Sequence, residues 1–293
     1  MRLDAASLDR RRFTPAQLHA LWAAIEINDV VAEVEPPAIS PTPIYPADQL
    51  IDGFAISRQL WREGFDREAL LAVVRSLARG ATLDETERLR FKHVRAKFKH
   101  LRFAFVLYGA DHRCPVMFKA VTTAMGHLQD AFKGGRVAAT RRHATILRTL
   151  LSGLPFAAMR REVDRLHASS PDDYRRFLGK QMATLRAMLA QPAMTGHQFH
   201  AARKIVSRQV SFHDDMRALS DNAEHPAMAR FLSAINGLMG RAHDDLVLGR
   251  ASGDVNYARA DVVLPTDLRA RLTALVDFYP PRPGDSSSSP PSR

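Results

Sequence analysis

The sequence predicts an all-α protein, and three observations support this fold class. Helix start and stop signals recur along the chain, and no alternating Val/Ile/Thr run typical of a strand stands between them. In addition, a helical cassette occurs twice. With 293 residues, the chain is long enough for one large domain or two small domains with substantial cores.

The first 81 residues predict a helical extension with a proline-rich linker. A helix is expected over residues 15–34, because Thr14 can cap it and Pro15 suits its first turn. Residues 36–46 contain five prolines, which predict a stiff extended linker that ends this helix. We expect a second helix over residues 66–79, which ends at Gly80.

The remaining chain, residues 82–280, predicts a helical domain. Residues 82–85 (TLDE) form a capping-box sequence, which opens a long helix that runs to Tyr108. The next helix starts at Pro115 and carries residues 125–130. The expected later helices cover residues 137–151, 171–190, 195–219, 226–248 and 265–278. The Ser- and Pro-rich tail, residues 281–293, is expected to be disordered.

The repeated cassette consists of a basic helix followed by a second helix with a Met-Gly pair. In the first copy, residues 92–102 read KHVRAKFKHLR and residues 125–130 read MGHLQD. In the second copy, residues 200–208 read HAARKIVSR and residues 239–244 read MGRAHD. A repeat at a spacing of about 110 residues indicates two similar helical units that face one another.

Positive charge is concentrated around the first copy. The formal net charge is +11, and residues 88–148 alone hold fourteen Lys and Arg against two acidic residues. Concentrated charge of this kind raises the local potential and attracts anionic partners. The rest of the chain is close to neutral.

Five of these cations share one face of the first basic helix. At 100° per residue they fall within a sector about 80° wide that extends for roughly 21 Å. A neighbouring sector is apolar, so one face packs on the core while the other stays available. A solvated face is the alternative, but it does not account for the absence of interleaved acids. The predicted anion-binding residues of this helix are Arg88, Lys92, Arg95, Lys99 and Arg102.

The second copy keeps the spacing but carries less charge. Its predicted contributors to an opposite wall are His200, Arg203, Lys204 and Arg208. A partly protonated His200 near phosphate would gain charge from the anion itself. The alternative for His200 is an ordinary surface or helix-end histidine.

These motifs resemble the CHAD family, the conserved histidine α-helical domain. That family's halves each carry a His-x-x-Arg helix followed by more basic residues, and then a Leu-Gly-x-x-(Arg/Asn)-Asp helix. The resemblance covers about residues 82–280. It implies two pseudo-symmetric four-helix bundles with a basic groove or pore between them. It also implies binding of inorganic polyphosphate, often at polyphosphate granules, without chemistry in the domain itself.

The chain departs from the family pattern at two motif positions. Lys92 stands where the first histidine is expected, which preserves charge but removes a pH-sensitive contact. Gln129 stands where the family has Arg or Asn. Residues 1–81 have no counterpart in the resemblance, and the pair Glu33 and Glu35 lacks the lysine of a triphosphate-tunnel strand.

Two other functions remain open. A basic groove also suits DNA or RNA, although the basic helix offers few exposed aromatics and no Asn or Gln for base edges. A metal-dependent phosphohydrolase of the HD type would use the His-Asp pairs at His213 and His243. We favour ion pairing with arginine over catalysis for Asp130 and Asp244. The sequence therefore predicts a non-enzymatic binding protein without a cofactor, a metal or catalytic residues.

Cysteine content and hydropathy bear on the compartment. Cys114 is the only cysteine, so no intrachain disulfide can form, which fits a reducing environment. We expect neither a signal peptide nor a membrane-spanning segment. These features favour the cytoplasm, with association with polyphosphate granules implied by the resemblance. They leave the oligomeric state open.

Overall fold

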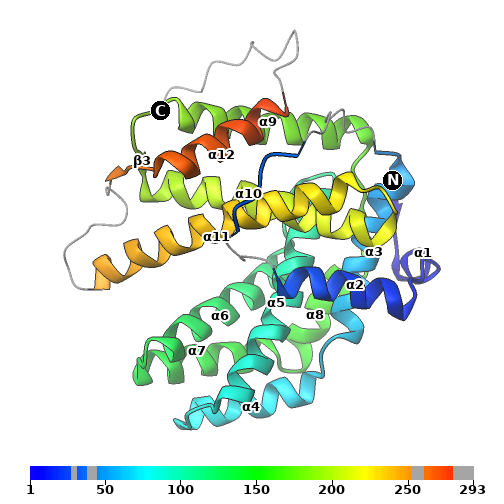
Figure 1. Cartoon of the computed structure of the whole chain (residues 1–293). Coiled ribbons are helices and arrows are strands. Elements are labelled where there is room, and N and C mark those ends of the chain that lie inside the picture. Colours follow the sequence, from blue (N-terminus) through cyan, green and yellow to red (C-terminus); the bar gives the residue numbers. More distant parts are fainter. Residues whose placement is uncertain (28–31, 38–44, 252–260, 280–293) are drawn as a thin grey trace, which may run out of the picture. The chain divides into compact units, whose positions relative to one another are not determined.

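The structure is a computed structural model that describes residues 1–27, 32–37, 45–251 and 261–279, without the side chains of residues 244–251 (Figure 1). The all-α prediction is confirmed, since the described residues form twelve helices and only two-residue strands. The first six helices are α1 (Ala5–Asp9), α2 (Pro15–Glu26), α3 (Ala47–Glu63), α4 (Arg67–Arg79), α5 (Glu85–Tyr108) and α6 (Val116–Lys133). The others are α7 (Val137–Leu150), α8 (Gly153–Val163), α9 (Pro171–Leu189), α10 (Gly196–Leu219), α11 (Glu224–Ala251) and α12 (Thr266–Asp277). The strands β1 (Arg2–Leu3) and β2 (Leu166–His167) pair antiparallel, as do β3 (Met194–Thr195) and β4 (Asp261–Val262).

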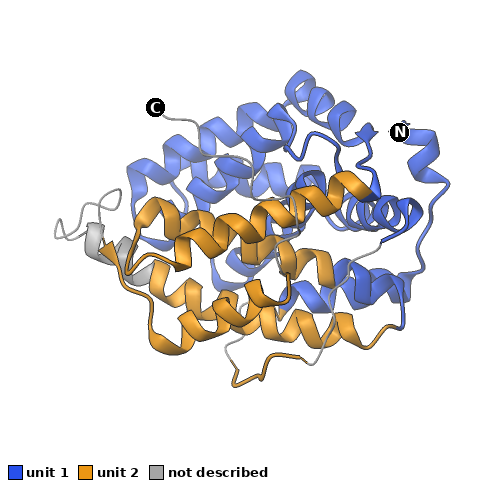
Figure 2. Ribbon diagram, turned by 90° about the horizontal axis from the view of Figure 1, so that it is seen from above, with its two compact units in different colours: residues 1–26, 45–171, 214–221 blue, residues 27–44, 172–213, 222–293 orange. Residues whose placement is uncertain are grey.

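The chain divides into two compact units, which Figure 2 colours separately. Unit 1 consists of residues 1–26, 45–171 and 214–221. Unit 2 consists of residues 27–44, 172–213 and 222–293. The N-terminal helices thus belong to the same unit as α5–α8, and residues 82–280 are shared between both units. The pseudo-twofold arrangement of two four-helix bundles stays a prediction, and the expected tail lies outside the described residues.

The N-terminal helices differ from the sequence prediction at two points. The cap of α2 is confirmed, because Thr14 Oγ1 accepts the Gln17 N–H at 3.2 Å and Gln17 Oε1 accepts the Thr14 N–H at 3.0 Å. However, α2 ends at Glu26 and not at residue 34. Helix α3 was not predicted, since Gly53 and Ser57 weaken its helical signal. Gly53 is required there, because a Cβ at that position would lie 2.5 Å from the Tyr108 ring.

The caps of α4 and α5 set the start of the basic helix. Gly80 ends α4 in the left-handed conformation at φ 98°, as expected for a C-terminal glycine. The capping box of α5 is formed by Asp84 and Glu87, two residues later than the TLDE prediction. Aspartate replaces threonine as the cap because its carboxylate accepts the Glu87 N–H at 2.7 Å. Helix α8 was also missed, because glycine and proline occupy its first turn.

The core of unit 1 is built on aromatic side chains from three helices. Trp61 of α3, Phe98 of α5 and Phe118 of α6 are almost fully buried. The Trp61 and Phe98 rings meet edge to face at a centroid distance of 5.4 Å, and Phe98 stacks on Phe118 at 5.5 Å. Each such pair contributes about 0.5–1.5 kcal/mol beyond area burial. This packing fixes the apolar face of α5.

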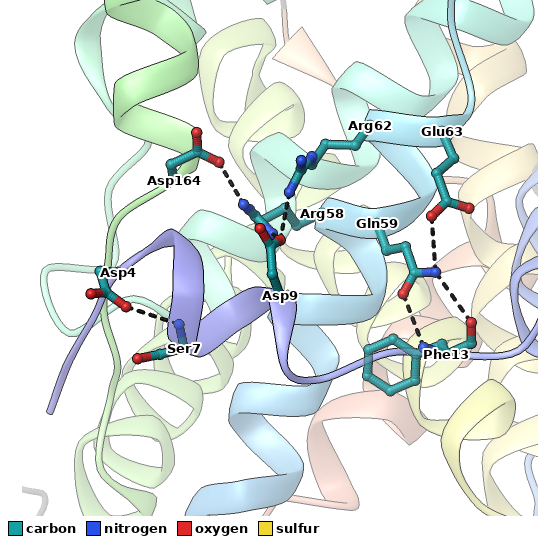
Figure 3. Close-up of polar contacts among 9 residues, drawn as sticks. All are labelled: Asp4, Ser7, Asp9, Phe13, Arg58, Gln59, Arg62, Glu63 and Asp164. Atoms are coloured by element: carbon teal, nitrogen blue, oxygen red, sulfur yellow. Dashed lines mark hydrogen bonds and ion pairs between the residues drawn. The ribbon is translucent and has the colours of Figure 1, made fainter.

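A buried arginine connects helix α1 to the rest of unit 1, as Figure 3 shows. Arg58 of α3 is 3% exposed and donates to Asp9 at 2.7 Å and to Asp164 at 2.5 Å. Arg62 donates to the same Asp9 carboxylate at 2.5 Å. The hydrogen bond from Arg58 lowers the pKa of Asp9 despite the opposing effect of burial. A buried guanidinium needs such partners, because an unpaired buried charge is strongly destabilising.

Unit 2 is held together by contacts that connect α9, α10, α11 and α12. The Tyr174 ring of α9 stacks on Phe212 of α10 at 5.2 Å. Ser207 of α10 donates to Asn236 of α11 at 2.7 Å, and both side chains are buried. Arg186 of α9 donates to the Val276 carbonyl of α12 at 2.5 Å. These bonds pair polar groups that would otherwise be buried without partners.

Among the described residues, none of the helices combines the length and apolar content needed to cross a bilayer.

Candidate anion-binding site

Helix α5 presents the predicted basic stripe along the edge of its buried face. Of the predicted apolar sector, Phe91, Phe98, Leu101 and Phe105 are buried, and Val94 is half-buried. Along the stripe, Arg88 and Lys92 are exposed near the start of the helix. The later members Arg95, Lys99 and Arg102 are half-buried. The exposure of the stripe side chains therefore decreases from the start of α5 toward its end.

Three members of the stripe, Arg88, Lys92 and Arg102, can be checked for contacts that would neutralise their charge. Arg102 donates to Thr122 Oγ1 at 3.4 Å, and the Lys99 ammonium lies 5.6 Å from the centroid of the Phe103 ring. Within the described part of the chain, Arg88, Lys92 and Arg102 form no ion pair with a carboxylate. The positive charge of these three residues is thus available to an anion.

Lys97, which lies outside the stripe, has a structural role. Its ammonium donates to the Gly64 carbonyl at 2.6 Å and lies 4.6 Å from the centroid of the Trp22 ring. Burial lowers the pKa of Lys97, and Glu26 partly opposes that effect. This side chain joins helices α2 and α5. The cations of α5 thus differ in role, since Lys97 takes part in packing while the stripe lies on another face.

The arginine of each cassette lies against the glycine of its Met-Gly pair. A Cβ placed on Gly126 of α6 would be 3.4 Å from Arg95 Nη2. A Cβ placed on Gly240 of α11 would be 3.2 Å from Arg203 Nη2. The same residue types thus make the same helix-to-helix contact in both units. Sequence reasoning identified the Met-Gly repeat but missed this steric role of its glycine.

In the second cassette, only part of the predicted wall faces outward. Lys204 is exposed, while His200 and Arg203 are half-buried. Arg208 instead turns toward α9, where it donates to Gln181 Oε1 and lies 6.0 Å from the Phe177 ring centroid. Burial lowers the pKa of Arg208 to about 10, which still leaves the guanidinium charged at neutral pH. Arg208 therefore helps to pack α9 against α10.

His200 differs from the expectation of a partly protonated ring. Its pKa is lowered to about 4, first by burial and then by Lys204, His243, Arg203 and His197. The imidazole is therefore neutral at pH 7 in the structure without an anion. The sequence identified the cations next to His200 in the chain but not His243, which belongs to α11 and lies 5.8 Å away between ring centroids.

The His-Asp pair at residues 213–215 is engaged in two internal networks. Asp215 is fully buried and accepts hydrogen bonds from Ser57 at 3.0 Å and Tyr108 at 2.7 Å. His100 Nε2 lies 2.8 Å from the same carboxylate. His213 Nδ1 lies 3.1 Å from His225 Nδ1. No group of three or more potential metal ligands occurs in the described ranges, which leave out the side chains of Asp244 and Asp245.

Of the two ion pairs predicted for the aspartates of the Met-Gly motifs, that of Asp130 is not found among the described residues, and that of Asp244 stays a prediction. The exposed Asp130 carboxylate pairs with no arginine among the residues that the structure describes; only its backbone carbonyl accepts, from Arg136 at 3.1 Å. The Asp244 side chain lies outside the described residues.

The predicted site residues thus belong to separate groups within their own units. The α5 stripe is part of unit 1, and His200, Arg203 and Lys204 are part of unit 2. A groove shared by both groups stays a prediction. No protein-family model, curated protein or solved structure matches this chain. The resemblance to the CHAD family accordingly rests on the two motif pairs.

Proposed function

We propose that the chain binds inorganic polyphosphate through the basic stripe of α5, together with His200, Arg203 and Lys204 of α10. The observation that carries this proposal is the positive charge of the exposed Arg88 and Lys92 and of the half-buried Arg102, none of which has a carboxylate partner among the described residues. Similar charges at i, i+3 and i+4 spacing repel one another, so a bound polyanion would relieve that repulsion.

Polyphosphate suits this surface because it offers one negative charge per unit along a flexible chain. Arginine can hold two phosphate oxygens through parallel hydrogen bonds, and lysine adds a mobile point charge. The half-buried Arg95 and Arg203 lie against the neighbouring helix of their own unit, so less side-chain freedom is lost on binding than for a fully exposed arginine. Under this proposal the chain is a binding protein without catalytic residues, and a cytoplasmic location at polyphosphate granules would follow.

Nucleic acid is the closest competing ligand, since it also presents a row of phosphates. The stripe of α5 lacks Asn and Gln between Arg88 and Arg102, and its aromatic residues Phe91, Phe98 and Phe105 are buried. Base edges and base faces would thus find few partners there. We therefore favour a ligand that is recognised through phosphate alone.

A competition experiment tests the proposal. Labelled long-chain polyphosphate is bound to the full chain, and unlabelled polyphosphate, duplex DNA or single-stranded RNA is added at matched phosphate concentration and salt. We expect polyphosphate to compete best, and affinity to fall steeply with salt as counterions are released. Better competition by either nucleic acid would contradict the proposal. Phosphate release in the presence of a divalent metal would instead support a hydrolase.

A further inference from the structure

His200 lies at the centre of a positively charged cluster in unit 2. Among the described residues, the charged and titratable groups around its ring are His197, Arg203 and Lys204 of α10 and His243 of α11. No described carboxylate pairs with Arg203. The Nδ1 atom of His200 is buried and has no hydrogen-bond partner among the described residues. Among the described residues, the protonated form of this histidine would thus face cations and no carboxylate.

This arrangement opposes protonation of the empty site. Burial and the neighbouring cations lower the pKa of His200 to about 4, so the ring carries no charge at neutral pH. A phosphate against Arg203 would add negative charge close to the ring and reverse the electrostatic part of that effect. A protonated imidazole donates from both nitrogens, and phosphate oxygens only accept. Protonation of His200 is therefore favoured when an anion is bound and disfavoured when none is bound.

We propose that anion binding at the cluster of His200, Arg203 and His243 is coupled to uptake of a proton by His200, so that unit 2 holds phosphate more tightly at mildly acidic than at neutral pH. This inference rests on the proposed function and adds regulation to it. The direction follows from linkage, because a ligand that raises the pKa of a group is bound more tightly as the pH falls toward that pKa.

The first cassette supplies an internal reference. Lys92 occupies the position that corresponds to His200, and its side chain is exposed. The two copies would thus differ at this position, since only the second has a histidine there that can take up a proton on binding.

The experiment measures binding of long-chain polyphosphate to the full chain at pH 7.5 and pH 5.5 and constant ionic strength. Interior phosphates keep one negative charge over this range, so the probe itself contributes little. Calorimetry in two buffers with different ionisation enthalpies gives the number of protons taken up. For the wild-type chain we expect affinity to rise about tenfold at the lower pH, with net proton uptake.

Two variants of His200 and one control assign the effect. His200→Lys introduces the residue of the first cassette, and it should raise affinity at pH 7.5 and remove most of the pH dependence. His200→Gln should bind weakly at both pH values. His19→Gln, which changes an exposed histidine of unit 1, should behave like the wild-type chain. Thermal melting checks that each variant is folded.

The outcomes separate the two proposals. If polyphosphate binds but His200→Lys keeps the wild-type pH dependence and proton uptake, the role of His200 is wrong and the proposed function stands. If polyphosphate binds the wild-type chain at neither pH, both are wrong. A wild-type affinity that is equal at both pH values, without proton uptake, overturns the inference alone.

Discussion

Arg203 lies against Gly240, so that a Cβ on this glycine would approach the guanidinium Nη2 to 3.2 Å. Arg95 makes the corresponding contact with Gly126, at 3.4 Å. Both contacts join the basic helix of a cassette to the helix of its Met-Gly pair. An added Cβ would make ordinary contact at Gly126 and would need a shift of a few tenths of an ångström at Gly240, so only a longer side chain would compete with the guanidinium for this space.

This contact predicts the effect of filling the space above Gly240. Gly240→Leu should displace Arg203 and weaken polyphosphate binding severalfold, whereas Gly240→Ala requires a shift of only a few tenths of an ångström. Binding is measured by anisotropy of labelled polyphosphate, with circular dichroism to confirm folding. Gly153→Leu is the matched control, because a Cβ at Gly153 meets nothing within 4 Å. Unchanged affinity in Gly240→Leu would show that Arg203 does not contribute to binding.

Charge reversal at the exposed start of α5 tests the stripe directly. The double variant Arg88→Glu and Lys92→Glu should lower polyphosphate affinity at least tenfold, since it changes four units of charge at two exposed residues that pair with no described carboxylate. The same reversal at Arg160 and Arg161 is the control, because both are exposed on α8 and outside the stripe. Equal losses in the two double variants would indicate an effect of net charge alone.

The buried carboxylate of Asp215 should be important for stability. Asp215→Ala removes the acceptor that Ser57, His100 and Tyr108 share, so the free energy of unfolding should fall by about 3 kcal/mol. Tyr108→Phe removes one of these bonds and should cost about 2 kcal/mol. Urea denaturation measures both values, and the exposed Asp221→Ala serves as the control. If Asp215→Ala unfolds like the control, the network does not stabilise unit 1.

Stability should also fall below neutral pH because of the pair His213 and His225. Burial lowers the pKa of His213 to about 3 and lowers that of His225, so the unfolded chain binds more protons than the folded chain below pH 6.5. The contribution of this pair to the free energy of unfolding is therefore fully present above about pH 6.5 and is lost as the pH falls toward 3. Urea denaturation at pH 7.5 and 5.0 measures this loss. The double variant His213→Leu and His225→Phe should lose less between the two pH values, and an equal loss would assign the effect to other groups.

Cys114 should react slowly with alkylating reagents in the folded chain. Burial raises the pKa of its thiol to about 12, so almost no thiolate is present at pH 8. Iodoacetamide should modify it at least about a hundredfold more slowly than in the urea-unfolded chain, as followed by mass spectrometry. Comparable rates in the two states would show that the thiol is accessible and ionised.

The local parts of this fold could be predicted from the sequence. Residues close in the chain set the starts of α2 and α9 and the end of α4 at Gly80, so these helix ends can be predicted from the sequence alone. Helix α3 could not be predicted, because its Gly53 is a weak helix former. The glycine is favourable there only because the Tyr108 ring packs against it in the folded chain. Tertiary contact outweighs local propensity at that position.

The candidate site divides in the same way. The order of cations on α5 follows from helical periodicity, so Arg88, Lys92 and Arg102 could be identified without coordinates. The inward turn of Arg208 and the neutral state of His200 depend on α9 and α11, which are distant in sequence. Their charge and exposure could not be read from neighbours along the chain.

The sequence alone determined the helical class, the duplicated cassette and the position of the positive charge, because periodicity and composition are properties of neighbouring residues. Only the tertiary structure decided which of those charges stay exposed, which are used in packing and which ring loses its proton. These outcomes depend on burial and on the charges that other helices bring close, and both arise only when the chain is folded.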